Sequence, residues 1–279
     1  MTDTNEWAEL QYNPRLSVSN AADYAGKWAA MAEATRLKLE HRANLVYGPH
    51  PREVLDFFPA QDPKGCVVFI HGGYWRSFSK DSFSWAADAL VPEGFSVAVI
   101  NYPLCPEVTI DEIAGACERA VAYVWREVLS DAERGRLIVT GHSAGGYLTA
   151  RLLLTDWRKF GLAEQIFCGG VPVSGVFELE PLIRTSINVQ TGLNLGDAKA
   201  WSVRPGAVAG GALQGVKIAV CVGGLESDEF KRQSREFAVA TGVPEALFIE
   251  SPNRHHFDVI EDIRDKKSGL FETLRVVGG

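Results

Sequence analysis

A serine at position 143 stands among glycines in a pattern that can place a nucleophilic hydroxyl at the tip of a sharp turn. The segment from Gly141 to Gly146 reads GHSAGG and follows the apolar run Leu137–Val139. A helical pattern comes next, so the context is the strand, turn and helix that a G-x-S-x-G nucleophile elbow requires. Side chains two residues either side of the serine would clash in so tight a turn. We therefore predict that Ser143 attacks a carbonyl carbon and forms a covalent acyl intermediate.

A second glycine turn, HGGYW, follows the apolar run Val67–Ile70. A tetrahedral intermediate carries an oxyanion that needs N–H donors roughly 3 Å away. Glycine has no side chain to keep the backbone from approaching a substrate. We expect the amides of Gly73 and Tyr74, with that of Ala144 directly after the serine, to form the oxyanion hole.

A serine hydroxyl also needs a base that removes its proton and an acid that orients the base. In chains with this elbow the order along the sequence is serine, acid, histidine. Of the six histidines, only His255 and His256 lie downstream of Ser143, after the predicted last strand. Either can serve as the base on this reasoning, and the other is then a turn residue.

Three carboxylates compete for the role of the acid on the loop GGLESDE that follows the apolar run Val216–Val222. Glu226 is the first choice because it lies earliest in the loop. Asp228 is the second choice, although Asp228 and Glu229 also suit the first turn of the following helix, where negative charge is favourable. Asp197, farther upstream, is the third.

The elements that must position these residues alternate between strands and helices. Short apolar runs predict strands at 54–58, 66–70, 95–100, 136–140, 166–172, 216–222 and 246–250. The β-branched-rich runs 66–70, 95–100 and 136–140 are expected to be buried on both faces. Helical patterns occupy 20–42, 82–90, 110–129, 144–155 and 230–241, and a last helix is expected from about 257. This alternation predicts an α/β fold with a mostly parallel central sheet and helices on both faces.

The segment 177–215 is too long for a simple crossover between strands, and it is rich in glycine and proline. It predicts a small lid insertion. With 279 residues, of which 46% are hydrophobic, we expect a single domain over 1–279 that carries this insertion.

Composition excludes several classes of partner and cofactor. The net charge of −7 argues against nucleic acid, and no apolar stretch approaches the roughly 20 residues that span a bilayer. The five cysteines are dispersed, so we expect neither disulfides nor a metal site, and no other cofactor. The first residues show no secretory signal, which favours a cytoplasmic protein that acts on a small molecule. A homodimer is left open.

Taken together, these motifs resemble the kynurenine formamidase (arylformamidase) branch of the α/β-hydrolases, near the hormone-sensitive-lipase-like esterases. The resemblance covers nearly the whole chain and includes the motifs YNPR from Tyr12, HGGYW, NYPL from Asn101 and GHSAGG. Tyr74 stands where the esterases usually have a third glycine. The similar acid loop ESDEF implies that Glu226 is the triad acid, and the motif HFD implies that His256 is the base.

The resemblance implies hydrolysis of N-formyl-L-kynurenine to L-kynurenine and formate without a metal. A formyl group is small, so we expect a narrow acyl site with aromatic walls. Tyr74, Trp75 and Phe177 are the candidate wall residues, and each of them suits core packing equally well. A short-chain carboxylesterase of the same fold is the alternative function. A non-catalytic hydrolase-fold binding protein is less consistent with the intact motifs.

Overall fold

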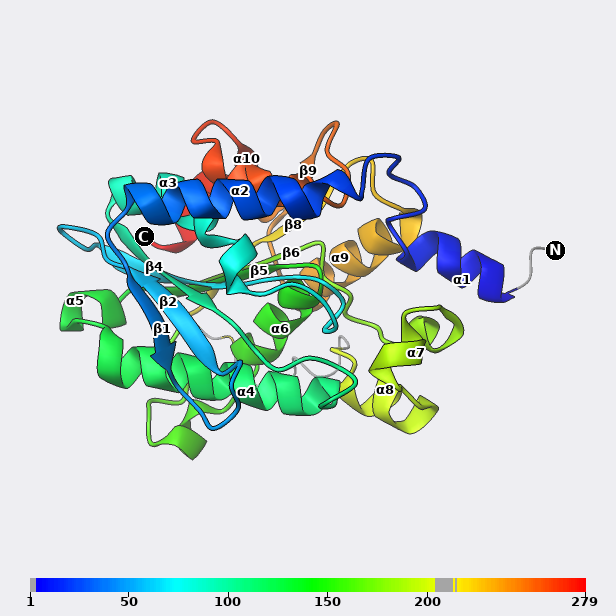
Figure 1. The fold of residues 1–279 in the computed structure, drawn as a ribbon, viewed down its shortest axis with the longest axis horizontal. Helices are drawn as coiled ribbons and strands as arrows, with labels where there is room; N and C mark the ends of the chain where they lie inside the picture. The colour runs from blue at the N-terminus through cyan, green and yellow to red at the C-terminus, as the bar shows by residue number, and fades with distance from the viewer. Residues whose placement is uncertain (1–3, 204–212, 214) are drawn as a thin grey trace.

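The computed structural model describes residues 4–203, 213 and 215–279, and its centre is one sheet (Figure 1). The described strands follow the order β1-β2-β4-β3-β5-β6-β8-β9, and β7 pairs with β6. Their bounds are β1 Arg42–Val46, β2 Val54–Phe58, β3 Gly65–Ile70, β4 Phe95–Ile100, β5 Leu137–His142, β6 Gly169–Val173, β7 Lys217–Ile218, β8 Val220–Gly223 and β9 Phe248–Ser251. β2 pairs antiparallel with both β1 and β4, and the other neighbours are parallel. The predicted mostly parallel sheet is confirmed.

Apolar side chains form a buried core on each face of this sheet, and helices cover both faces (Figure 1). In β3, Val68 and Ile70 belong to the core on one face, whereas Val67 and Phe69 belong to the core on the other. The helices that pack on the first core are α4 Ile110–Tyr123, α6 Ala144–Leu153 and α9 Asp228–Ala240. Those that pack on the second core are α2 Asp23–Lys38, α3 Ala87–Leu90 and α10 Gly269–Val277.

Capping and amphipathic spacing explain where α4 begins and which face it buries. Thr109 and Glu112 form a capping box, in which the Thr109 hydroxyl accepts from the Glu112 amide at 3.2 Å and Glu112 accepts from the Thr109 amide at 2.8 Å. Ile110, Ile113 and Cys117 follow at helical spacing and are fully buried. The predicted helix over 110–129 is this helix followed by one π-helical turn.

The remaining helical segments are short, apart from one at the N-terminus. They are α1 Thr4–Tyr12, α5 Asp131–Arg134, α7 Asn188–Thr191, α8 Leu195–Trp201, the π turn Val124–Val128, and the 3-10 segments Lys80–Ser82, Ser84–Ala86, Val91–Glu93, Trp157–Phe160, Glu180–Arg184, Glu245–Leu247 and Val259–Arg264. The helix predicted from about 257 is therefore wrong at its start, because a 3-10 segment comes first and α10 begins at Gly269. Among the described residues, no helix combines the length and the apolarity that crossing a membrane requires.

The segment predicted as a lid contains α7, α8 and the 3-10 segment Glu180–Arg184, which lie at the same end of the molecule as α1 (Figure 1). Glu9 of α1 fixes this segment, because its carboxylate accepts from the amide and the hydroxyl of Ser186, both at 2.6 Å. Residues 204–212 and 214 of the predicted lid lie outside the described residues. The role of this segment as a lid stays a prediction.

Candidate active site

Ser143 occupies a strained turn between β5 and α6. Its φ is 57° and its ψ is −116°, a backbone conformation that costs a non-glycine residue roughly 1–3 kcal/mol. The Ser143 amide donates to the carbonyl of Val173 at 2.9 Å, which ties the turn to the end of β6. The helix begins at Ala144, as the sequence predicts, whereas the strand continues to His142, two residues beyond its predicted end.

The glycines around Ser143 allow the turn to pack against neighbouring backbone. A Cβ on Gly145 would lie 2.1 Å from the carbonyl oxygen of Ile70 in β3. A Cβ on Gly141 would lie 2.5 Å from the carbonyl oxygen of Gly145, and one on Gly146 would lie 2.7 Å from that of Val173. Since real Cβ atoms do not approach oxygen so closely, each position requires glycine.

The second glycine turn adjoins the serine directly. A Cβ on Gly72 would lie 2.8 Å from the carbonyl oxygen of His142 and 3.3 Å from the Cβ of Ser143. The turn continues through Gly73 at a φ of 107° and Tyr74 at a φ of 50°. The structure thus brings together the two segments whose amides are the candidate oxyanion donors.

The histidine and the acid predicted for the site form a short, enclosed pair. The Nδ1 atom of His256 lies 2.6 Å from the Oε2 atom of Glu226, and the Glu226 side chain has no exposed area. The other carboxylate oxygen accepts from the hydroxyl of Ser174 at 2.5 Å and from the amide of Gly223 at 2.7 Å. Both oxygens of Glu226 are therefore hydrogen-bonded, as a buried carboxylate requires. Ser174 belongs to no recognised motif, and sequence reasoning missed it.

The competing carboxylates lie in other environments. The side chain of Asp228 is 92% exposed and pairs with Lys231 in the first turn of α9. Glu229 accepts a hydrogen bond from the hydroxyl of Tyr12. Asp197 lies in the first turn of α8, where its amide donates to Asn194. None of the three contacts His256 in the described structure.

His255 points away from the Glu226–His256 pair and toward α2. Its Nε2 atom lies 3.3 Å from the hydroxyl of Tyr24, and its Nδ1 atom lies 3.2 Å from Asp258. The His255 amide also donates to Asp258, at 2.7 Å. These contacts hold the turn that presents His256.

A pocket with about 550 Å³ of space, its open mouth included, lies over Ser143 and His256. We call it the serine pocket, and this volume is typical of small-molecule sites. Its aromatic walls are Trp28, Tyr74, Phe78, Phe83 and Phe257, and the rest of its lining is Asn13, Pro14, Arg15, Gly72, Gly73, Arg76, Ser77 and His142. Of the residues that line the pocket, sequence reasoning named only Tyr74 as a wall residue, although the motifs YNPR and HFD supply Asn13, Arg15 and Phe257.

Two of the three candidate wall residues pack elsewhere. Trp75 is fully buried and meets the ring of Tyr147 edge-on, with centroids 5.2 Å apart. Phe177 stacks on Phe237 with centroids 4.3 Å apart and borders a different hollow. Tyr74, in contrast, shares the serine pocket with Ser143.

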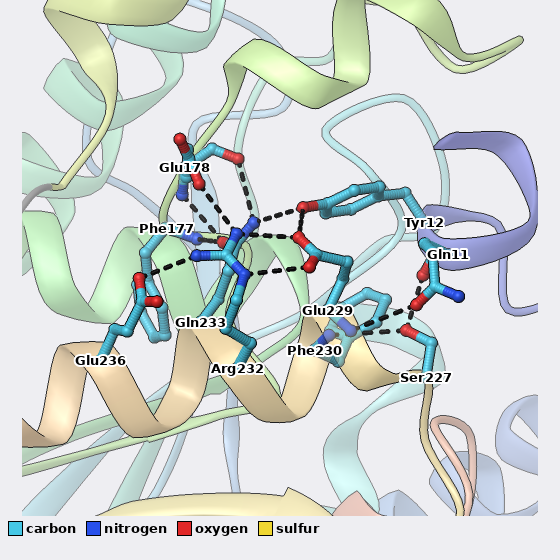
Figure 2. Close-up of polar contacts among 10 residues, drawn as sticks. All are labelled: Gln11, Tyr12, Phe177, Glu178, Ser227, Glu229, Phe230, Arg232, Gln233 and Glu236. Atoms are coloured by element: carbon cyan, nitrogen blue, oxygen red, sulfur yellow. Dashed lines mark hydrogen bonds and ion pairs between the residues drawn. The ribbon is translucent and has the colours of Figure 1, made fainter. Parts of the chain in front are cut away.

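Hydrogen bonds at the end of α1 anchor the N-terminal segment to α9 (Figure 2). Tyr12 is 1% exposed, and its hydroxyl donates to Glu229 at 2.5 Å and accepts from Gln233 at 2.8 Å. The carbonyl of Tyr12 accepts from the hydroxyl of Tyr74. Ser227 adds a bond to the carbonyl of Gln11 at 2.6 Å. These bonds place the residues that follow Tyr12 on the wall of the serine pocket.

Two buried histidines flank the site without taking part in the pair. Burial lowers the pKa of His71 to about 4, and its ring stacks 4.1 Å from that of Tyr102. Burial, together with the nearby His256, lowers the pKa of His142 well below its ordinary value. Both rings are therefore neutral near pH 7. Among residues 4–203, 213 and 215–279, no three side chains of His, Cys, Asp or Glu gather as metal ligands.

Comparisons with known proteins agree with this architecture. The family model BD-FAE matches residues 56–162. The chain is similar to kynurenine formamidases, and that of Salmo salar is 29% identical over 240 residues, which cover 83% of this chain and 80% of the relative.

Solved structures extend the comparison over almost the whole chain. A structure from Silicibacter sp. TM1040, described provisionally as a thioesterase, is 34% identical with a TM-score of 0.82, and the match covers 96% of this chain and 99% of that chain. An esterase from Pyrobaculum calidifontis is 16% identical with a TM-score of 0.69, over 98% of this chain and 95% of that chain. The α/β-hydrolase fold predicted from the sequence is confirmed.

Proposed function

Because the chain belongs to the kynurenine formamidase-like α/β-hydrolases and is a hydrolase, we propose that it cleaves an aryl formamide, N-formyl-L-kynurenine, through a Ser143–His256–Glu226 triad. The observation that carries this proposal is the enclosed 2.6 Å contact between His256 and Glu226, in a chain whose serine pocket is lined by both Ser143 and His256. The kynurenine formamidases among the relatives support the substrate class.

In the proposed mechanism, Glu226 fixes the imidazole of His256 through Nδ1, which leaves Nε2 to take the proton of Ser143. The serine oxygen attacks the formyl carbon and forms a tetrahedral intermediate. His256 then gives the proton to the departing arylamine nitrogen, and formyl-serine remains. Water, activated by the same histidine, releases formate and restores the serine.

In this proposal, backbone amides donate hydrogen bonds to the oxyanion of the tetrahedral intermediate and stabilise its negative charge. Gly72 allows the glycine turn to reach the Cβ of Ser143, so the amides of Gly73 and Tyr74 are available on one side. The amide of Ala144, at the start of α6, is available on the other side. Fixed donors of this kind commonly contribute about 3 kcal/mol each to transition-state stabilisation.

The acyl group is proposed to be small because Tyr74 takes the place of a glycine beside the oxyanion turn. Its hydroxyl is bound to the carbonyl of Tyr12, so the ring is held in place. A hydrophobic pocket rewards an extra methylene by only about 1–3 kcal/mol, so discrimination between acyl groups requires steric exclusion. We assign that exclusion to Tyr74 alone, since Trp75 does not line the pocket.

Ester hydrolysis is the second candidate function, because a serine triad would serve it equally well. The esterase from Pyrobaculum calidifontis shares the fold, and the 34% identical structure carries a provisional thioesterase description. Neither likeness distinguishes a formamide from an ester or a thioester.

The experiment compares kcat/KM for N-formyl-L-kynurenine, p-nitrophenyl butyrate and a butyryl thioester, each measured with and without EDTA. We expect the formamide to have the highest kcat/KM despite its poorer leaving group, because Tyr74 excludes the butyryl chain. Efficient turnover of the butyrate ester or thioester without turnover of the formamide would overturn the proposal. Activity that requires zinc or manganese would overturn the mechanism itself.

A further inference from the structure

The serine pocket is lined by basic side chains, although acidic residues outnumber basic ones in this chain. The protein has 35 acidic and 28 basic residues, yet the charged side chains that line the pocket are those of Arg15 and Arg76. No aspartate or glutamate of the described residues lines it. The two arginines therefore give the pocket lining a positive charge in a protein that carries a net negative charge.

Arg15 reaches the pocket from the N-terminal segment. Its backbone is hydrogen-bonded, whereas its guanidinium has no partner among the described residues. The Arg15 amide donates to the side chain of Asn13 at 3.3 Å, and Asn13 in turn donates to Glu9 at 2.7 Å. The network of Tyr12 with α9 anchors this segment one turn earlier (Figure 2). The guanidinium of Arg15 forms no ion pair or hydrogen bond with the described residues. A cation fixed in this way is available to a ligand.

Arg76 reaches the pocket from the turn that follows the oxyanion motif. Its guanidinium donates to the side-chain oxygen of Gln190 at 2.6 Å, so that partner is neutral. The carboxylate of Glu9 interacts electrostatically with Arg76, but its oxygens already accept from Asn13 and Ser186. With five N–H donors, Arg76 retains donors for an anion.

The two arginines lie nearer to solvent than the reactive groups of the pocket. Arg15 is exposed and Arg76 is partly exposed, whereas Ser143 and His256 are 3% and 4% exposed. A ligand with its carbonyl at Ser143 therefore presents its far end to the arginines. The aromatic walls, which include Trp28 and Phe257, lie along the same pocket.

We infer that Arg15 and Arg76 form an anion subsite that binds a carboxylate at the far end of the substrate from the scissile carbonyl. This inference rests on the proposed function and deepens it, because it restricts the substrate to formamides whose aromatic leaving group carries a distant carboxylate. In N-formyl-L-kynurenine that group is the carboxylate of the amino acid. Guanidinium groups bind carboxylates through paired, charge-assisted hydrogen bonds, which neutral esters cannot form.

The test measures binding, so that it does not depend on turnover. Isothermal titration calorimetry on the intact protein compares L-kynurenine with kynuramine, the same aromatic amine without the carboxylate. We expect L-kynurenine to bind about tenfold more tightly or better, as a charge-assisted bond implies. The ratio should fall as salt is raised, because exposed arginines are screened.

Variants assign this difference to the two arginines. Arg15→Gln and Arg76→Gln should each weaken binding of L-kynurenine and leave kynuramine nearly unchanged, and Arg15→Lys should retain more of the ratio than Arg15→Gln. Arg42→Gln, at an exposed arginine of β1 outside the pocket lining, is the matched control and should change nothing. Equal binding of the two compounds, absence of L-kynurenine binding, or a ratio untouched by both glutamine variants would overturn the subsite.

A second measurement separates this inference from the proposed function. Formylkynuramine carries the same aryl formamide without the carboxylate, so its hydrolysis reports on the formamidase activity alone. Turnover of formylkynuramine, with no preference for L-kynurenine over kynuramine in binding, would contradict the anion subsite and support the proposed formamidase activity. Preferential binding of L-kynurenine, without turnover of N-formyl-L-kynurenine or formylkynuramine, would support the anion subsite and contradict the proposed formamidase activity.

Discussion

The Nδ1 atom of His256 and the Oε2 atom of Glu226 lie 2.6 Å apart, and neither side chain is more than 5% exposed. Glu226 lies in the loop after β8, and His256 follows β9, so the parallel pairing of these two strands brings them together. Ser174, after β6, bonds to the second oxygen of Glu226. The pair is thus held by loops at the carboxyl ends of three neighbouring parallel strands, where ligands bind in open α/β sheets.

Substitution of the acids distinguishes Glu226 from its neighbour in the loop. Glu226→Gln keeps the shape of the side chain and removes the charge that stabilises the imidazolium, so we expect kcat to fall by roughly three to four orders of magnitude. Asp228→Asn, at a side chain that is 92% exposed, should leave kcat within about twofold. Steady-state kinetics of both variants decide the assignment. The reverse order would move the acid to Asp228.

Substitution of the histidines makes the equivalent comparison. His256→Ala should abolish nearly all turnover, because Ser143 then lacks a base. His255→Ala should retain most activity and lose about 1 kcal/mol of stability, since it removes the side-chain contacts with Tyr24 and Asp258. Kinetics and urea unfolding of the two variants test this. A His255→Ala protein that is folded and inactive would contradict the account.

Acid should destabilise the fold through its buried histidines. Burial lowers the pKa of His71 from 6.5 to about 4 and shifts that of His142 in the same direction. The unfolded chain therefore binds more protons in this range, so the stabilisation is complete above pH 6.5 and is lost as the pH falls toward 4. We expect His71→Phe, which keeps the stack on Tyr102, to reduce the slope of unfolding free energy against pH by up to about 1.4 kcal/mol per unit. An unchanged slope in urea titrations would count against a neutral, buried His71.

The glycines of the elbow are expected to matter for stability as well as for catalysis. Gly145→Ala places a Cβ where the backbone oxygen of Ile70 already lies, so we expect a loss of about 3 kcal/mol or more in the free energy of unfolding. Gly26→Ala is the control, because that glycine lies within α2 and a Cβ there meets nothing within 4 Å. It should stabilise the protein by about 0.5–1 kcal/mol. A Gly145→Ala protein with the same urea midpoint of unfolding as the wild type would contradict the close packing of Gly145 against Ile70.

Strongly patterned elements were predictable from the sequence. The strands Val54–Phe58 and Phe95–Ile100 have the predicted bounds, because β-branched runs end at turn residues. α1 was missed, since its stability comes from distant contacts such as that of Tyr12 with Glu229. β1 was also missed, because it is an exposed edge strand without apolar alternation.

The walls of the serine pocket were harder to predict than its reactive residues. A motif specifies which residue must occupy a turn. It does not specify whether the side chain of the adjacent residue points into the pocket or into the core. Tyr74 and Trp75 are consecutive, and only Tyr74 lines the serine pocket. Trp28 and Phe83 come from segments that belong to the second core, and their place on the wall depends on how α2 crosses the sheet.

The measurement that tests the central claim most directly is the site of labelling by a serine-directed fluorophosphonate. The account predicts one adduct per chain, located on Ser143 by peptide mass spectrometry, with loss of formamidase activity in proportion to labelling. The Ser143→Ala protein should remain folded, take up no label and retain less than about a thousandth of wild-type turnover. An adduct on another residue, or a Ser143→Ala protein that keeps more than about a tenth of its activity, would contradict a mechanism based on Ser143.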